Sequence, residues 1–193
     1  MRGIGSPAPR PRRVDARRNR EAILRAADEA YRTPGVEVTL EEVARRAGLG
    51  RATVYRHFAD RRTLAYAVAH FHLCALDELA RSEITFRELL AAILTEQVAR
   101  RSLVTVFRDL PTGEQHRLVR ALMDVLGPAF RRAQAAGEVR ADVEPGDLEL
   151  VFEMVEGAME TGPRETRRDH PTQRLIKVIV DGLFVTPDPA LRG

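Results

Sequence analysis

The stretch TLEEVARRAGLGRATVYRHF, which begins at Thr39, constrains the fold of this chain more than any other. Thr39 is placed to cap a helix, and Glu42, three residues later, completes the pattern of a capping box. Apolar residues then recur at helical spacing until Gly48, where a sharp reversal of the chain requires a positive φ. Val54 and Phe58, four residues apart, give a second helix its buried face. Turn glycine and apolar anchors at these spacings predict a helix-turn-helix.

The face of the second helix opposite Val54 is polar. Side chains that can donate hydrogen bonds to base edges or phosphates gather there, namely Arg51, Thr53, Tyr55, Arg56 and His57. The first helical residues, from Arg51 to Thr53, would lie deepest in the major groove. An ordinary helical hairpin with a solvated outer face is the alternative. The cap, the turn glycine and the polar face agree with one another and favour a DNA reader.

A further contact is expected just after the second helix. Asp60 is placed to cap the next helix, and Arg61 then lies at its start, where free backbone N–H groups also favour a phosphate. The residues that we expect to contact DNA are Thr39, Arg51, Ala52, Thr53, Tyr55, Arg56, His57 and Arg61.

From Arg20 to Leu64 the chain resembles the DNA-binding domain of TetR-family transcription regulators. The segments that carry this resemblance are REAILRAADEAY, VTLEEVARRAGL, RATVYRHF and ADRRTL. Three positions depart from the family pattern: Gly50 stands where Ser or Thr often caps the recognition helix, Arg61 where Lys is usual, and Val36 where an aromatic residue is common. Glycine is a weaker cap by roughly a few tenths of a kcal/mol. It also removes one hydroxyl that could contact a phosphate.

Composition is that of a globular protein. Of the 193 residues, 44% are hydrophobic and 31% charged, and no apolar run is long enough to cross a bilayer. The basic N-terminus lacks the apolar run of a signal peptide, and the single cysteine, Cys74, excludes an internal disulfide. We therefore expect a cytoplasmic protein with no membrane partner.

The charges are distributed unevenly along the chain. Residues 1–62 hold 15 arginines and 8 acidic residues, a net charge of +7, whereas the remainder holds 16 basic and 20 acidic residues, a net charge of −4. A basic N-terminal part and an acidic C-terminal part are expected where an N-terminal domain contacts DNA and the rest of the chain does not.

The sequence predicts three regions. Residues 1–15 are rich in Pro, Gly and Arg and are expected to form a disordered basic arm. This arm would either contact DNA phosphates or the minor groove, or serve only as a solubilising tail. Residues 16–62 are expected to form the helix-turn-helix DNA-binding domain, and residues 63–193 a helical ligand-binding and dimerisation domain.

The pattern predicts helices throughout and no strand, because no segment alternates with period two. We expect an all-α fold of about nine helices. The first is predicted from Arg17 to Tyr31, the fourth from about Arg62 to Arg81, and the last from Thr172 to Val185. The capping residues predicted in the second half of the chain are Thr85 with Glu88, Thr112 with Gln115, and Asp147.

The last two long helices are apolar over much of their girth. Such helices need cover on two flanks, of which one can be their own core and the other a second subunit. The resemblance implies that this pair forms a four-helix homodimer interface, which would match two reading heads to a palindromic operator. The residues expected at this interface are Val151, Val155, Ala158, Leu175, Ile176, Ile179, Val180, Leu183 and Phe184. The alternative is that both helices are internal.

An acidic stripe runs along the first of these helices, through Glu149, Glu153, Glu156 and Glu160. It could line a site for a cationic ligand. A solvated face, or pairing with nearby arginines, is the more common explanation for such a stripe.

The resemblance also implies a pocket for an unknown small-molecule effector, between the fourth helix and those that follow. The residues that could line it are Phe71, Phe107, Arg108, His116, Met123, Phe130, Phe152 and Met159. Each of the apolar ones would also suit an ordinary core position, and Arg108 and His116 would suit the surface.

Enzyme motifs are absent from the sequence. There is no G-x-S-x-G elbow and no phosphate-binding loop with its lysine. His70 and Cys74 are four residues apart and could share a metal ion, but no further ligand accompanies them. We expect no catalytic residue, no metal and no cofactor.

Taken together, the sequence favours a transcription regulator, most simply a repressor. It would bind double-stranded DNA as a homodimer and be released by a small molecule that changes the spacing of the two reading heads. Two alternatives are a nucleic-acid-associated protein that binds mainly by charge and responds to no ligand, and a helical ligand carrier or enzyme with a vestigial DNA-binding head.

Overall fold

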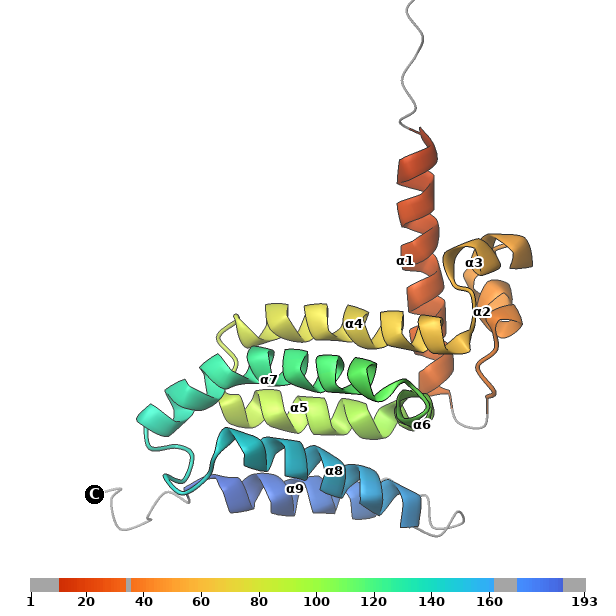
Figure 1. The fold of residues 1–193 in the computed structure, drawn as a ribbon. Helices are drawn as coiled ribbons and strands as arrows, with labels where there is room; N and C mark the ends of the chain where they lie inside the picture. The colour runs from red at the N-terminus through yellow and green to blue at the C-terminus, as the bar shows by residue number, and fades with distance from the viewer. Residues whose placement is uncertain (1–10, 34–35, 162–169, 186–193) are drawn as a thin grey trace, which may run out of the picture. The chain divides into compact units, whose positions relative to one another are not determined.

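The computed structural model describes residues 11–33, 36–161 and 170–185. These residues form nine helices (Figure 1), which confirms the predicted all-α fold. The helices are α1 (Pro11–Arg32), α2 (Leu40–Ala47), α3 (Arg51–His57), α4 (Arg61–Ala80), α5 (Phe86–Ala99), α6 (Arg101–Arg108), α7 (Thr112–Ala135), α8 (Pro145–Thr161) and α9 (His170–Leu183).

The chain divides into two compact units, and the boundary between them follows Val68, within α4. The N-terminal unit holds α1, α2, α3 and the start of α4. The C-terminal unit holds the rest of α4 and the helices after it. The boundary predicted from the sequence lies slightly earlier, after residue 62.

A single apolar core holds the N-terminal unit together. Side chains from α1, the α1–α2 connection, α2, α3 and α4 are all at most 1% exposed in it, namely Ile23, Ala27, Ala30, Tyr31, Val38, Val43, Val54, Phe58, Leu64, Ala65 and Val68. Burying each of the larger ones contributes roughly 1.5–3 kcal/mol, so this core fixes α2 and α3 against α1.

Helix α1 begins earlier than the sequence indicated. It starts at Pro11, not at Arg17, and proline is well suited to a first helical turn because its missing N–H would have no partner there. Residues 11–15, which were assigned to the arm, are therefore helical. The remainder of the predicted arm, residues 1–10, lies outside the described residues.

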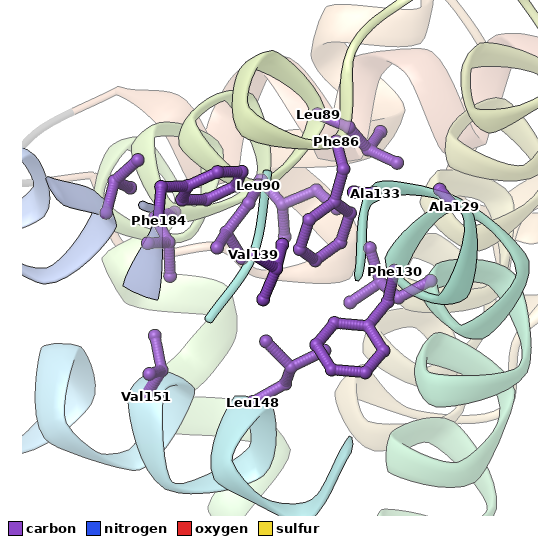
Figure 2. Packing of buried hydrophobic residues seen from close by; sticks show 14 of the residues in the cluster. Phe86, Leu89, Leu90, Ala129, Phe130, Ala133, Val139, Leu148, Val151 and Phe184 are labelled. Carbon is purple, nitrogen blue, oxygen red and sulfur yellow. The ribbon is translucent and has the colours of Figure 1, made fainter. Parts of the chain in front are cut away.

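The core of the C-terminal unit centres on three aromatic rings (Figure 2). The ring of Phe86 on α5 meets that of Phe130 on α7 edge to face, with 5.6 Å between centroids, and lies 5.8 Å from the ring of Phe184. Leu90 and Leu148 lie beside these rings and are fully buried. The guanidinium of Arg87 covers the outer side of this cluster, 4.3 Å from the centroid of the Phe184 ring.

One short strand-like pairing interrupts the helical pattern. Val139, in the α7–α8 connection, forms an isolated antiparallel bridge with Phe184 at the end of α9. The N–H of Arg140 donates to the carbonyl of Leu183 at 3.1 Å, and the N–H of Val185 donates to that of Glu138 at 2.8 Å. The α7–α8 connection is thus tied to the end of α9.

The predicted helix caps of the C-terminal unit have mixed outcomes. The capping box of Thr85 with Glu88 is confirmed, since each side chain accepts from the other residue's N–H. The cap at Thr112 is wrong: Pro111 precedes α7 without a side-chain cap. Gln115 instead donates to the carbonyl of Leu110 at 2.7 Å.

Asp147 does not cap α8 either. The helix begins two residues earlier, at Pro145, and the Asp147 carboxylate accepts from the N–H of Glu144 at 2.8 Å. An acidic side chain in the first turn can satisfy the backbone just before the helix as well as the helix itself, so the two arrangements look alike in sequence.

Among the described residues, none of the helices combines the length and the apolar character that crossing a membrane would require.

Candidate nucleic-acid interface

The turn between α2 and α3 has the geometry that the sequence predicts. The Thr39 hydroxyl caps α2 by accepting from the N–H of Glu42 at 3.1 Å. Gly48 ends α2 with φ +66°, in the left-handed region, and the N–H of Leu49 returns to the carbonyl of Ala44 at 3.0 Å. A Cβ at Gly48 would meet no atom within 4 Å, so the backbone conformation alone requires glycine there.

The predicted capping box at Thr39 is only half formed. The Glu42 carboxylate does not return to the backbone of Thr39 but accepts from Arg45 and Arg46, at 2.7–2.8 Å. These hydrogen bonds lower the pKa of Glu42 to about 2. Helical neighbours three and four residues away compete with a cap for the same carboxylate.

Helix α3 presents its polar side to solvent. Val54 and Phe58 are buried beneath it, while Arg51, Ala52, Tyr55 and Arg56 are exposed, and Thr53 and His57 are half-buried. Gly50 precedes the helix without a side-chain hydrogen bond. Arg61, at the start of α4, is exposed as well. Asp60 caps that helix as predicted, by accepting from the N–H of Thr63 at 2.7 Å.

Tyr55 is held by a residue that sequence reasoning missed. Its hydroxyl donates to Oε1 of Glu41 on α2, at 2.7 Å. This hydrogen bond lowers the pKa of Glu41 and raises that of Tyr55, because it stabilises the ionised carboxylate together with the protonated phenol. The two residues are 14 apart in sequence and lie on different helices, so helical spacing does not predict the contact.

Arg56 folds back along α3. Its Nε donates to the carbonyl of Ala52, and its Nη2 donates to the hydroxyl oxygen of Thr53, both at 3.1 Å. Thr53 therefore accepts a hydrogen bond while keeping its own proton available for an outside acceptor.

Two further contacts support α3 and the start of α4 from α1. The guanidinium carbon of Arg20 lies 4.8 Å from the centroid of the Phe58 ring, a cation–π contact that sequence reasoning also missed. Burial raises the pKa of Tyr31, and the positive charge of Arg61 partly opposes that shift. The Tyr31 hydroxyl has no hydrogen-bond partner of standard geometry among the described residues.

The residues predicted for a dimer interface mostly face the core of their own chain. Val151, Val155, Ile176, Val180 and Phe184 are buried in the C-terminal core, and Leu175, Ile179 and Leu183 are half-buried. Only Ala158 is exposed. The same two helices, which lie side by side in Figure 1, expose three large apolar side chains instead: Leu150 (56%), Met154 (58%) and Val178 (62%).

The residues predicted for a ligand site are scattered. Phe130 and Met159 are buried in the core, Met123 and Phe152 pack against it, and Phe71 and Phe107 are half-buried. Arg108 and His116 are exposed, and Arg108 donates to Glu156. None of the eight lines the open depression of about 690 Å³ formed by Asp77, Ala80, Arg81, Ser82, Asp124, Val125, Pro128 and Arg132.

The remaining candidates have ordinary surroundings. In the acidic stripe, Glu149 and Glu153 are exposed and Glu156 binds Arg108, whereas the Glu160 side chain lies outside the description. Cys74 Sγ lies 3.7 Å from Nδ1 of His70. The described residues contain no group of three or more potential metal ligands.

Comparison with known proteins points to one family for both units. Residues 23–68 match the model of the tetR family of bacterial regulatory proteins, and residues 96–185 match that of the SbtR-like transcriptional regulator C-terminal domain. An uncharacterised helix-turn-helix transcriptional regulator of Mycobacterium bovis is 29% identical over 69% of this chain and 74% of its own.

Solved structures agree with this assignment. A TetR transcription regulatory protein from Mycobacterium vanbaalenii is 30% identical, with a TM-score of 0.64 over 91% of this chain and 100% of its own. A TetR transcriptional regulator from Streptomyces coelicolor is 25% identical, with a TM-score of 0.65 over 86% of this chain and 99% of its own. Both likenesses extend through the helix-turn-helix and the C-terminal helices.

Proposed function

We infer that this chain, which belongs to the TetR family of bacterial regulatory proteins, represses transcription as a homodimer on a palindromic operator and is released by a small-molecule effector. It is a transcriptional regulator with a DNA-binding domain, and its family is not a family of enzymes. The exposed polar face of α3 is the observation that carries the proposal. Val54, on the opposite side of the helix, is buried in the core of the N-terminal unit and leaves this face open to a partner.

The DNA contacts proposed are those of the predicted reading face. Arg51, Ala52 and Thr53 at the start of α3 would meet base edges, and Arg56, His57 and Arg61 would meet bases or phosphates. Thr39 keeps its hydroxyl proton while capping α2, so it can still donate to a phosphate.

The homodimer is proposed to form through the exposed side of α8 and α9. Leu150, Met154 and Ala158 repeat every four residues and so form one stripe on α8, and Val178 is a large exposed apolar side chain on the neighbouring helix α9. Gly182, four residues after Val178, would let a partner helix approach closely. Large exposed apolar side chains on two neighbouring helices support the proposal that a second copy of this chain buries them.

An effector site is proposed inside the C-terminal unit. Gln97 on α5 supports this location: its Nε2 donates to the carbonyl of Phe152 at 3.0 Å, while its buried Oε1 has no partner among the described residues. A ligand that donates to this oxygen would satisfy it, and Met123 and Phe152 are proposed to line the same site. The other candidates are Phe71, Phe107, Arg108, His116, Phe130 and Met159.

Binding-site selection from random DNA, followed by titration with salt, tests the proposal. We expect an enriched inverted repeat, a solution mass twice that of the 21.6 kDa chain, and a preference over random DNA that persists as salt increases. Arg51→Ala should abolish that preference, whereas Arg131→Ala, on α7, should preserve it. A monomer with equal affinity for every sequence would instead support binding by charge alone.

A further inference from the structure

We propose that Glu41 fixes the hydrogen-bond polarity of Tyr55, so that Tyr55 accepts from a base amino group in the major groove and does not donate to a DNA phosphate. The base would be adenine or cytosine, whose N6 and N4 amino groups are the hydrogen-bond donors of the major groove. The inference rests on the proposed role of α3 in reading DNA.

The pair that carries this inference lies within the helix-turn-helix. Tyr55 is 46% exposed on α3, and its hydroxyl donates to the half-buried Glu41 at 2.7 Å. Glu41 lies in the first turn of α2, where the helix dipole stabilises a negative charge. An ionised carboxylate can only accept hydrogen bonds, so the single proton of the Tyr55 hydroxyl is committed to Glu41.

A hydroxyl in this state offers only lone pairs to a third group. Phosphate oxygens are also acceptors, so they gain nothing from Tyr55, and the nearby Glu41 carboxylate would repel them. Adenine N6 and cytosine N4 carry protons and match the exposed lone pairs of Tyr55. Arg51 is the positive charge that acts on Glu41, and it offsets part of the repulsion that Glu41 exerts on DNA as a whole.

Thr53 provides the opposite case on the same helix. Its hydroxyl oxygen accepts from Arg56 at 3.1 Å, which leaves its proton free to donate. Thr53 would therefore favour acceptors, such as guanine O6 and N7, thymine O4 or a phosphate. Two hydroxyls two residues apart are thus prepared for opposite partners, one by an acidic neighbour and the other by a basic one.

Binding-site selection with the full-length protein, its Tyr55→Phe variant and its Glu41→Ala variant tests this assignment. We expect the wild-type protein to select adenine or cytosine at one position in each half-site. Tyr55→Phe should lose that preference and retain the others, with affinity for the selected site falling roughly 5- to 150-fold and affinity for random DNA unchanged. Thr53→Val should change a different position.

Glu41→Ala separates positioning from charge. Removing a negative charge should raise affinity for every sequence, but only loss of the Tyr55 constraint should relax the adenine or cytosine preference. The double variant Tyr55→Phe, Glu41→Ala should have the same base preference as the single variant Tyr55→Phe, because Glu41 acts on base preference only through the Tyr55 hydroxyl. Circular dichroism of each variant would check that the fold is retained.

The result that overturns the inference is a Tyr55→Phe variant that weakens selected and random DNA equally, or neither. The first would identify Tyr55 as a phosphate contact, and the second would remove it from the interface. If the wild-type protein itself enriches no sequence, the proposed function fails, and this outcome is distinct from either result with Tyr55→Phe.

Discussion

Nε of Arg46 lies 2.7 Å from Oε1 of Glu42, one helical turn away on α2. Arg45 holds the same carboxylate with Nε and Nη2, so two guanidinium groups share one acid at the start of the DNA-binding motif. Hydrogen bonds to both lower the pKa of Glu42 to about 2. Because Arg46 also lies 3.7 Å from Glu29, the cluster links α2 to α1.

This cluster predicts a loss of stability in acid. A carboxyl whose pKa is lower in the folded state stabilises the fold above its unfolded pKa, and the gain disappears as the pH falls toward the folded value. For Glu42 the window runs from 4.5 down to about 2. We expect Glu42→Gln to be less stable than wild type near neutral pH and to converge with it across that window, in thermal unfolding followed by circular dichroism. Equal pH profiles for Glu42→Gln and wild type would contradict the prediction.

Gly48→Ala should destabilise the N-terminal unit by about 1–2 kcal/mol, since a side chain in the left-handed region crowds its own backbone. The surroundings add nothing to this cost, because the new Cβ would meet no atom within 4 Å. Gly50→Ser is the matched control: its φ of −65° suits any residue, and a serine cap should stabilise α3 by roughly a few tenths of a kcal/mol. Urea denaturation would measure both. Equal effects of the two changes would mean that the turn tolerates a different backbone.

Local rules made the helix-turn-helix predictable from sequence. A hydroxyl one residue before a helix, a glycine at a reversal and an apolar pair four apart each have one simple structural solution, so Thr39, Gly48 and Val54 occupy the predicted places. The contact between Glu41 and Tyr55 joins two helices through one half-buried and one exposed side chain. Nothing in the spacing of either helix distinguishes that pair from other polar neighbours.

Which side of α8 and α9 faces the core could not be predicted from the sequence, for a different reason. Both helices are apolar on two flanks, and sequence does not tell which flank meets the core of the same chain. The predicted interface residues Val151 and Val155 face inward, and Leu150 and Met154, each one residue away, face outward. A difference of one residue rotates a helix position by about 100°, which is enough to exchange core for surface.

The exposed arginines of α1 should contribute to DNA affinity without contributing to sequence preference. Arg17 and Arg18 are exposed, and α1 reaches the end of α3 through the contact of Arg20 with Phe58. Replacing Arg17 and Arg18 with alanine should reduce the slope of log affinity against log salt by up to about 2, if each meets one phosphate.

Fluorescence anisotropy at several salt concentrations would measure this slope. The matched control replaces Arg117 and Arg120, which are exposed on α7, and should leave it unchanged. An unchanged slope for the α1 variant would assign these arginines to solubility alone.

Met154→Lys should dissociate the proposed dimer. Met154 is 58% exposed between Leu150 and Ala158, so a charge there would be desolvated in the dimer but would stay solvated in a monomer. We expect a halved mass in sedimentation and a corresponding loss of operator affinity. Val14→Lys, at an exposed apolar position of α1, is the control and should keep the mass unchanged. If Met154→Lys keeps the wild-type mass, the partner covers another surface.

Phe130 distinguishes a core role from a ligand role. Its side chain is 1% exposed, and its ring meets that of Phe86 edge to face (Figure 2), so we expect Phe130→Ala to lower the free energy of unfolding by about 3–5 kcal/mol through the cavity it leaves. Phe152→Ala, at the half-buried edge of the same core, should cost less, because neighbouring side chains and water can fill the space. Urea denaturation followed by far-UV circular dichroism measures the free energy of unfolding of both variants. If Phe130→Ala keeps full stability and instead abolishes release from DNA by an effector, the residue belongs to the ligand site after all.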